Sequence, residues 1–438
     1  MIEIYRTDQT GRGCRVAPLE RTAAGTDHAP VIAIEPVRQY QEILGFGAAL
    51  TDAACYLLYQ LGEKTREAFF QEAFSPSSMD LSVCRICVGA SDYARECYSY
   101  DETPDDLTLR DFSIHHDREY IIPVLRRLRE INPDLFLFSS PWSPPGWMKT
   151  GRSMMGGWMR RQYLEVYAEY YLRFLREYGV AGVRIDALTV QNEPETDQQG
   201  RMPACYWHPE DETAFIRDYL GPRLREAGLG TRVWLMDHNY DLWRRAAWML
   251  EDRDLAAWTD GVAFHGYGGV PEMMSALHQA YPHINLYWTE GGPELGPAYA
   301  VEWARWGEAF AAIMRNWCRS ITVWNLILDK TGGPNIGPFS CAGLVTLDVE
   351  TQEITHSGQY WALWHLSRFV RRGARRIESS GDHYGLSHVA FLNSDGSVVL
   401  FLTNTGPDRE VALVLNGSEF RCAVTSNSVS TVVWLCKA

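Results

Sequence analysis

The sequence predicts an α/β protein: a (β/α)8 barrel with a small antiparallel β-sandwich-like module attached. Three observations lead to this fold class. Between about residues 40 and 370, short apolar runs alternate with longer amphipathic stretches, which is typical of parallel βα units. The chain has 438 residues, enough for a barrel of roughly 250 residues and a second domain. After about residue 370 the alternation stops and short β-rich runs follow one another.

Eight apolar runs are expected to form the barrel strands. Eight repeats without a break favour a closed barrel over an open, doubly wound sheet. The segments between them have helical spacing, as in residues 159–178, where aromatic residues recur three or four positions apart. The expected strands are residues 43–50, 81–90, 135–140, 187–191, 233–236, 261–265, 286–289 and 321–328.

The end of the chain is expected to form the side module. Its β-rich runs are separated by turn signals such as Asn416-Gly417. The first residues also hold strand-like runs, such as residues 31–34, that do not fit the barrel. We therefore expect the barrel to span residues 36–368 and the β module to combine residues 1–35 with 369–438. The expected C-terminal strands are residues 389–392, 398–403, 411–415 and 431–435.

Composition and charge exclude several classes of function. The formal net charge of −14 argues against a nucleic-acid partner and against adhesion to anionic membranes, because both need a basic face. No apolar run approaches the roughly 18 residues of a membrane span, so no membrane insertion is expected. The N-terminus lacks an apolar signal segment, and ten cysteines are scattered without a disulfide rhythm. These features predict a cytoplasmic protein. They leave its oligomeric state open.

Polar and aromatic residues replace aliphatic ones where the expected barrel strands end. Catalytic groups of barrel enzymes project from these C-terminal ends. The second strand is followed by Asp92, the fourth by Glu193, and the seventh by Glu290. Such residues are poorly suited to packing alone, so their position predicts an active site. The other strand ends carry Trp142, Asn192, Asp237, His238, Asn239, His265, Tyr267 and Trp324.

Glu193 and Glu290 are the candidate catalytic pair. They lie on different, near-opposed strands, and each follows a strongly apolar stretch. Retaining glycosidases use two carboxyl groups about 5–5.5 Å apart, one as nucleophile and one as acid and then base. Trp142, Tyr267 and Trp324 are expected to face the sugar. His238 and His265 stay open between hydrogen bonding to the site or to sugar hydroxyls and a purely structural role.

Other chemistries have no support in the sequence. There is no H-E-x-x-H, no G-x-S-x-G and no G-x-x-x-x-G-K-[ST] motif. No group of His, Cys and carboxylates has the spacing of metal ligands. We therefore expect no cofactor and no metal, and a small-molecule carbohydrate as the partner.

Several longer motifs occur in order over roughly residues 40 to 435. They resemble those of glycoside hydrolase family 30, the glucosylceramidase-like retaining β-glycosidases. The motifs are residues 45–53, Arg85 through Asp92, residues 140–149, Gln191-Asn-Glu-Pro194, the Trp324-Asn325 pair and Gly332-Gly-Pro-Asn335.

The resemblance implies the same two-part fold and retaining hydrolysis of β-glycosides. It implies that Glu193 is the acid/base and Glu290 the nucleophile. It further implies that Arg85 orients the nucleophile and that Asn192 binds the sugar 2-hydroxyl. Residues implied to line the sugar subsite are Arg85, Asp92, Trp142, Asn192, Tyr267 and Trp324; His265 joins the candidates by its strand-end position.

Two loops, residues 196–205 and 336–341, depart from the glucosylceramidase pattern and leave the aglycone open. The main expectation is an exo-acting β-glucosidase or β-xylosidase on small glycosides or oligosaccharides. A β-1,6-glucanase or a glucosylceramidase is the alternative within the family. A non-catalytic carbohydrate-binding barrel is the alternative outside it, and would be suggested by loss of either Glu193 or Glu290; both are present.

Overall fold

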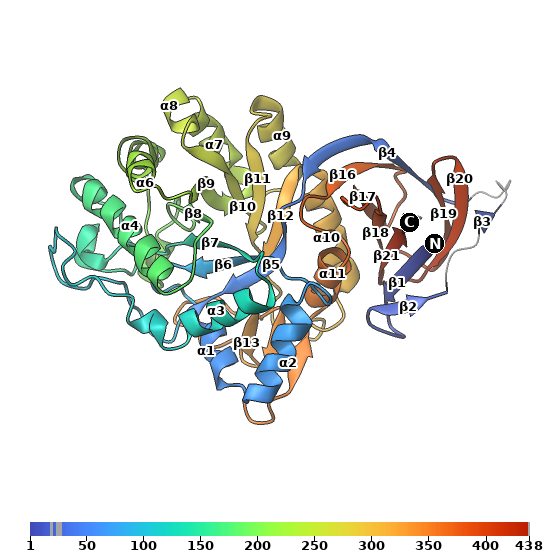
Figure 1. Ribbon diagram of the computed structural model, residues 1–438, viewed down its shortest axis with the longest axis horizontal. Helices are drawn as coiled ribbons and strands as arrows, with labels where there is room; N and C mark the ends of the chain where they lie inside the picture. The colour runs from blue at the N-terminus through green and yellow to red at the C-terminus, as the bar shows by residue number, and fades with distance from the viewer. Residues whose placement is uncertain (18–20, 23–28, 437–438) are drawn as a thin grey trace.

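The computed structural model describes residues 1–17, 21–22 and 29–436 and contains a closed barrel beside a curled sheet (Figure 1). Within the described residues the barrel has eight strands, all parallel, and β12 pairs back to β5 to close it. Each predicted run overlaps one of them, so the predicted barrel is confirmed. The strands are β5 (Gly45–Leu50), β6 (Val83–Cys87), β7 (Phe136–Ser140), β8 (Ala187–Thr189), β9 (Arg232–Asn239), β10 (Thr259–His265), β11 (Asn285–Glu290) and β12 (Cys318–Val323).

The last barrel strand is shorter than predicted. The chain leaves the barrel after Val323, and Asn325 adopts a positive φ of 56° that turns it aside. The predicted run 321–328 therefore spans two strands. The second, β13 (Ile327–Asp329), forms a separate three-stranded sheet with β14 (Val345–Leu347) and β15 (Ile354–His356).

Helices surround the barrel. The aromatic spacing predicted for residues 159–178 corresponds to α4, whose buried face includes Tyr167, Tyr171 and Phe174. In the described residues no helix is long and apolar enough to cross a membrane. The helices are α1 (Asp52–Gln60), α2 (Glu63–Phe74), α3 (Ile121–Ile131), α4 (Leu164–Val180), α5 (Pro209–Ala214), α6 (Gly221–Glu226), α7 (Trp243–Leu250), α8 (Arg253–Ala256), α9 (Glu272–Ala280), α10 (Trp303–Arg315) and α11 (Gly358–Ser367).

The barrel interior changes from apolar to polar along its strands. Successive inward residues are two apart, so Val83 is followed by Arg85 and Phe138 by Ser140. In the lower layer Trp234 stacks on Tyr287, with ring centroids 3.9 Å apart, and fills the barrel. The upper layer is polar and lies at the C-terminal ends. It consists of Arg85, Ser140, Thr189, Asp237, His265 and Thr289.

The curled sheet, here called the side sheet, joins both ends of the chain: β1 pairs with β21. Its described strands follow the order β2-β1-β21-β18-β17-β16-β4-β19-β20-β3. The module is mixed rather than purely antiparallel as predicted, because β4 and β19 run parallel. The strands are β1 (Ile2–Thr7), β2 (Cys14–Val16), β3 (Arg21–Thr22), β4 (Val31–Glu42), β16 (Arg375–Ser380), β17 (Leu386–Leu392), β18 (Val398–Asn404), β19 (Arg409–Leu415), β20 (Ser418–Val424) and β21 (Ser428–Trp434).

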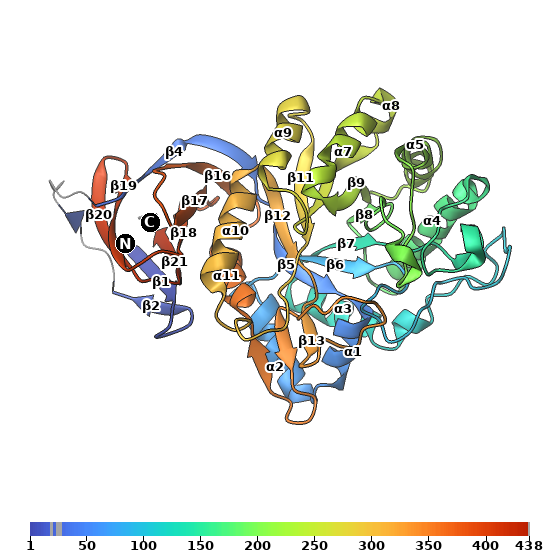
Figure 2. The same ribbon diagram turned by 180° about the vertical axis from the view of Figure 1, so that it is seen from behind.

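The side sheet packs against the barrel through α10 and α11, which lie between the two (Figure 2). The indole of Trp303 in α10 donates to the carbonyl of Asn427, and both imidazole nitrogens of His365 in α11 bond to side-sheet threonines. β4 runs across residue 36, where the sequence places the boundary between the parts. The predicted module also includes residues 18–20, 23–28 and 437–438, which lie outside the described residues.

Candidate active site

A cavity of about 370 Å³ opens at the C-terminal ends of the barrel strands. It is here called the active-site cavity. Seven of the predicted site residues line it, and the other two, Arg85 and His265, lie beneath and contact its carboxylates. The structure thus brings all nine together. The seven are Asp92, Trp142, Asn192, Glu193, Tyr267, Glu290 and Trp324.

Asp237 organises the polar layer beneath the cavity. It is fully buried and accepts hydrogen bonds from the five other side chains of that layer. Arg85 Nη2, Ser140 Oγ and Thr189 Oγ1 lie 2.7–2.8 Å from its Oδ2. Thr289 Oγ1 and His265 Nε2 lie 2.8 and 3.1 Å from its Oδ1. Burial would raise the pKa of Asp237, but the charge of Arg85 and the bond from His265 hold that pKa well below its usual range.

A β-bulge turns Asp237 inward. On β10, Ala263 pairs with Met236 and the next residue pairs with His238, so Asp237 is the extra residue on β9. Met236 and Asp237 both have positive φ, at 72° and 51°. Such backbone is unfavourable for residues other than glycine and is found most often where function requires it.

Glu290 ends β11 and is held from two sides. Arg85 Nη1 donates to its Oε2, and the Tyr267 hydroxyl donates to its Oε1 at 3.1 Å. His265 Nε2 lies 3.8 Å from Oε2. Glu290 is 6% exposed and is one of the residues that line the active-site cavity.

Glu193 follows β8 and has a positive φ of 50°. Its backbone N–H donates to the carbonyl of Asp237 at 3.0 Å, which fixes its position over the polar layer. Gln198 Nε2 donates to its Oε2 at 2.9 Å, and His265 Nδ1 lies 3.4 Å from its Oε1. The imidazole of His265 therefore lies between the two glutamates, with one nitrogen toward each.

The two glutamates differ in pKa. Burial raises the pKa of Glu290, and the charges of His265 and Arg85 oppose that shift without cancelling it. Burial would also raise the pKa of Glu193, but the hydrogen bond with His265 and nearby imidazoles lower it on balance. Burial alone would lower the pKa of His265, but the carboxylates of Glu290, Asp237 and Glu193 raise it to about 9. With this pKa, His265 is mostly the cationic imidazolium at neutral pH, with a proton on each ring nitrogen.

One wall of the cavity is aromatic and carries a free carboxyl oxygen. Trp142 and Trp324 stack with centroids 5.0 Å apart, and the Arg85 guanidinium lies 4.6 Å from the Trp142 ring. Asp92 is 4% exposed, and among the described residues its Oδ1 has no hydrogen-bond partner. Burial and the two nearby glutamates raise the pKa of Asp92. An unpaired buried acceptor beside flat indole faces suits a sugar hydroxyl.

Four residues outside the predicted site set also shape the site: Asp237, Gln198, Phe339 and Cys341. Asp237 was visible at a strand end, but its central place depends on the bulge. Gln198 lies in the loop 196–205, and Phe339 and Cys341 lie in the loop 336–341; both loops line the cavity. These are the loops that depart from the glucosylceramidase pattern, and this departure was the signal that could have identified them.

A second hollow, of about 590 Å³, adjoins the active-site cavity. Tyr267 and Glu294 line both, so the two hollows are neighbours at these residues. The second hollow also presents Trp288, Trp306 and Arg305. This hollow therefore places aromatic and polar side chains beside the active-site cavity.

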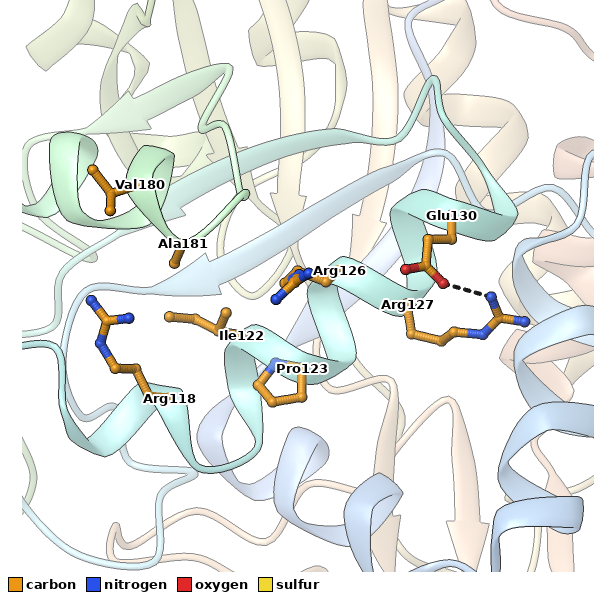
Figure 3. Close-up of a pocket in the computed structure, with 8 residues that line it drawn as sticks. All are labelled: Arg118, Ile122, Pro123, Arg126, Arg127, Glu130, Val180 and Ala181. Carbon is orange, nitrogen blue, oxygen red and sulfur yellow. Dashed lines mark hydrogen bonds and ion pairs between the residues drawn. The ribbon is translucent and has the colours of Figure 1, made fainter.

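A third hollow, on α3 and the end of α4, shares no lining residue with the active-site cavity (Figure 3). It is lined by Arg118, Arg126 and Arg127, and the last of these bonds to Glu130 at 2.7 Å. It contains no pair of acidic groups comparable to that of the active-site cavity, because Glu130 is the one acidic residue among its described lining.

Comparison with protein families agrees with this geometry. Residues 43–370 match the family model described as the glycosyl hydrolase family 30 TIM-barrel domain. Residues 373–432 match the model of the glycosyl hydrolase family 30 beta sandwich domain. Together the two matches cover most of the chain, and both parts of the fold correspond to the observed barrel and side sheet.

Three similar proteins cover nearly the whole chain. Putative glucosylceramidase 1 of Caenorhabditis elegans is 30% identical over 431 residues, covering 92% of this chain and 81% of the relative. An endo-1,6-β-D-glucanase of Neurospora crassa is 30% identical over 388 residues, covering 84% of this chain and 80% of the relative. The solved structure of the endo-β1,6-glucanase BT3312 has a TM-score of 0.90 at 29% identity, covering 99% of this chain and 100% of that one.

Proposed function

The chain belongs to glycosyl hydrolase family 30 and is a retaining glycosidase, and on that premise we propose that it cleaves β-1,6-linked glucan. The observation that carries the proposal is a second hollow that adjoins the active-site cavity and shares Tyr267 and Glu294 with it. Two neighbouring hollows of about 370 and 590 Å³ have room for more than one sugar of a chain. Two of the three similar proteins are named as endo-1,6-β-glucanases, which supports the same linkage.

Glu290 is the proposed nucleophile. Its carboxylate attacks the anomeric carbon while the bond from that carbon to the leaving oxygen breaks, giving a glycosyl–enzyme ester. The raised pKa of Glu290 and the lowered pKa of Glu193 are the reverse of what this first step needs. The contacts nevertheless support Glu290 as the nucleophile. The Arg85 ion pair and the Tyr267 hydroxyl both stabilise the ionised form of Glu290.

Glu193 is the proposed acid and then base. In the first step it gives a proton to the departing oxygen; His265, hydrogen-bonded to Glu193 and mostly protonated near neutral pH, can supply that proton. In the second step ionised Glu193 takes a proton from water, which attacks the anomeric carbon and releases Glu290. The bonds from Gln198 and His265 favour the ionised Glu193 that this step requires.

The remaining side chains are proposed to bind the sugar at the point of cleavage. Trp142 and Trp324 offer stacked rings, and Asp92 offers its unpaired oxygen to a hydroxyl. Asn192 is held by Arg85 Nη2 at 2.7 Å through its Oδ1, which leaves its amide N–H groups to donate to the 2-hydroxyl. A hydrogen bond there strengthens as charge develops in the transition state.

Product analysis on linear β-1,6-glucan tests the proposal. We expect fragments of several sizes before glucose accumulates, and a kcat/KM well above that on aryl β-glucosides or aryl β-xylosides. Glucose as the first and dominant product would favour the exo-acting mode that is the main expectation from the sequence. Failure to cleave β-1,6-glucan while aryl β-xylosides are turned over would reject the proposed linkage and sugar.

Glucosylceramide is the second candidate substrate. Met202, Phe339 and Cys341 give the cavity an apolar side, and one similar protein is named as a putative glucosylceramidase. The same assay with glucosylceramide in detergent micelles separates the two. A higher kcat/KM on glucosylceramide than on β-1,6-glucan would replace the first candidate with the second.

A further inference from the structure

Two imidazoles and one carboxylate converge at the floor of the active-site cavity. Glu193 follows β8, His238 lies in β9 and His265 ends β10, so three neighbouring strands contribute one group each. From Glu193 Oε1, His265 Nδ1 is 3.4 Å away and His238 Nδ1 is 3.7 Å away. One ligand atom from each residue fits within 4.8 Å of the other two.

We propose that Glu193, His238 and His265 bind a single zinc-type divalent ion, which inhibits the enzyme by occupying its acid/base. Zinc binds imidazole nitrogen and carboxylate oxygen at about 2.0–2.2 Å, so ligand atoms around a tetrahedral ion lie roughly 3.3–3.5 Å apart. The separations from Glu193 to the two imidazoles are already close to that range. Small side-chain rotations would complete the set.

His238 supplies an independent observation. Only 10% of its side-chain surface is exposed, and within the part of the chain that the structure describes its Nδ1 has no hydrogen-bond partner. Buried polar atoms are nearly always paired, because leaving one unpaired costs free energy. An ion at this point would satisfy that nitrogen.

His265 is already oriented as a metal ligand. Its Nε2 bonds to Asp237 Oδ1 at 3.1 Å, so the Nε2 proton is held there and Nδ1 is left toward Glu193. A carboxylate that fixes the far nitrogen of a ligating histidine is the usual outer shell of zinc sites. At neutral pH His265 also carries a proton on Nδ1, and that proton leaves to solvent when the ion binds.

The ligand types select the class of ion. Two nitrogens and one oxygen suit zinc, copper or nickel, whereas calcium and magnesium prefer oxygen ligands. Three protein ligands leave the remaining position to water facing the cavity. An ion on Oε1 of Glu193 would block proton transfer to the leaving group and from water. The expected inhibition rests on the proposed acid/base role of Glu193. Binding of the ion does not depend on that role.

Cobalt substitution tests the binding directly. One equivalent of Co²⁺ added to the full chain should give the visible absorption of a four-coordinate ion, and Zn²⁺ should displace it. In His238→Asn the absorption should be lost or need at least tenfold more Co²⁺. His238→Cys should add a thiolate-to-cobalt charge-transfer band, since the new side chain would be a ligand. His283→Asn, at an exposed histidine, should match the wild-type protein.

Zn²⁺ titration of the hydrolysis rate tests the consequence, with each variant expressed relative to its own metal-free rate. Wild type and His283→Asn should be inhibited reversibly, and His238→Asn should need at least tenfold more Zn²⁺. Unchanged cobalt absorption in His238→Asn, with no new band in His238→Cys, would overturn the metal site. Binding at the site without inhibition would keep the site and instead reject Glu193 as the acid/base.

Discussion

Arg85 Nη2 lies 2.8 Å from Asp237 Oδ2, and both side chains are fully buried beneath the active-site cavity. The same guanidinium also contacts Glu290 and Asn192. Asp237 itself is not part of the cavity lining, so its effect on a bound sugar passes through the residues it holds. The pair therefore links the stability of the barrel interior to the position of the proposed nucleophile.

Replacing Asp237 with Asn should both destabilise the fold and lower activity. The substitution removes the charge that balances buried Arg85, and breaking a buried ion pair on one side typically costs about 3–5 kcal/mol. Urea denaturation measures the free energy of unfolding, and kcat/KM measures the loss of Glu290 positioning. Asp111→Asn, in the exposed Arg110–Asp111 pair, is the matched control and should leave both unchanged. Wild-type stability in Asp237→Asn would contradict the central place given to this carboxylate.

Replacing Asp92 should lower activity without lowering stability, unlike the replacement of Asp237. Its Oδ1 has no partner among the described residues, so Asp92→Asn should not lower the free energy of unfolding. If the carboxyl binds a sugar hydroxyl in a desolvated pocket, Asp92→Ala should weaken transition-state binding by about 3 kcal/mol. The corresponding loss in kcat/KM is roughly 150-fold. Kinetics and urea denaturation on the same preparations check both statements. Equal losses of stability and activity would mean that Asp92 is structural.

The two glutamates are separated by the products of azide rescue. Glu290→Ala should be nearly inactive on every substrate, and azide entering from the vacated side should give the α-glycosyl azide. Glu193→Ala should still form the glycosyl–enzyme from dinitrophenyl β-glucoside, because that leaving group needs no proton, and azide should then give the β-glycosyl azide. On poor leaving groups the loss should reach about 10²–10⁴-fold. Nuclear magnetic resonance of the products identifies the anomers, and exchanged products would reverse the assignment.

His265 should make stability depend on pH in a defined window. Its pKa is raised to about 9 in the folded protein from an ordinary value near 6.5. A histidine whose pKa is raised on folding contributes its full stabilisation at pH values below its pKa in the unfolded chain. That stabilisation is lost as the pH rises through its pKa in the folded protein. The difference in unfolding free energy between wild type and His265→Gln should therefore shrink by roughly 2–4 kcal/mol between pH 6 and pH 10. Urea denaturation at both pH values checks it, and a constant difference would show that His265 is neutral in the fold.

Much of the architecture is a local property of the sequence. Hydrophobic periodicity in short windows identified each barrel strand, because a strand buried on both faces must be apolar along its length. Glu193 and Glu290 were recognisable because polar residues interrupt those runs where the strands end. β20 was not recognisable, since most of its side chains are only partly buried and it carries little apolar signal.

Only the tertiary structure decided which distant residues act together. Simple alternation along β9 places Trp234 and Met236 on one face and Asp237 on the other, and a one-residue bulge reverses this for Asp237. Likewise, the contact from Gln198 to Glu193 depends on the path of a loop, and the pairing of β1 with β21 joins opposite ends of the chain. A bulge, a loop path and a long-range pairing arise from contacts between distant segments. Local periodicity therefore set the strands and the placement of the candidate catalytic pair, while folding alone set the charges and hydrogen bonds around the two glutamates.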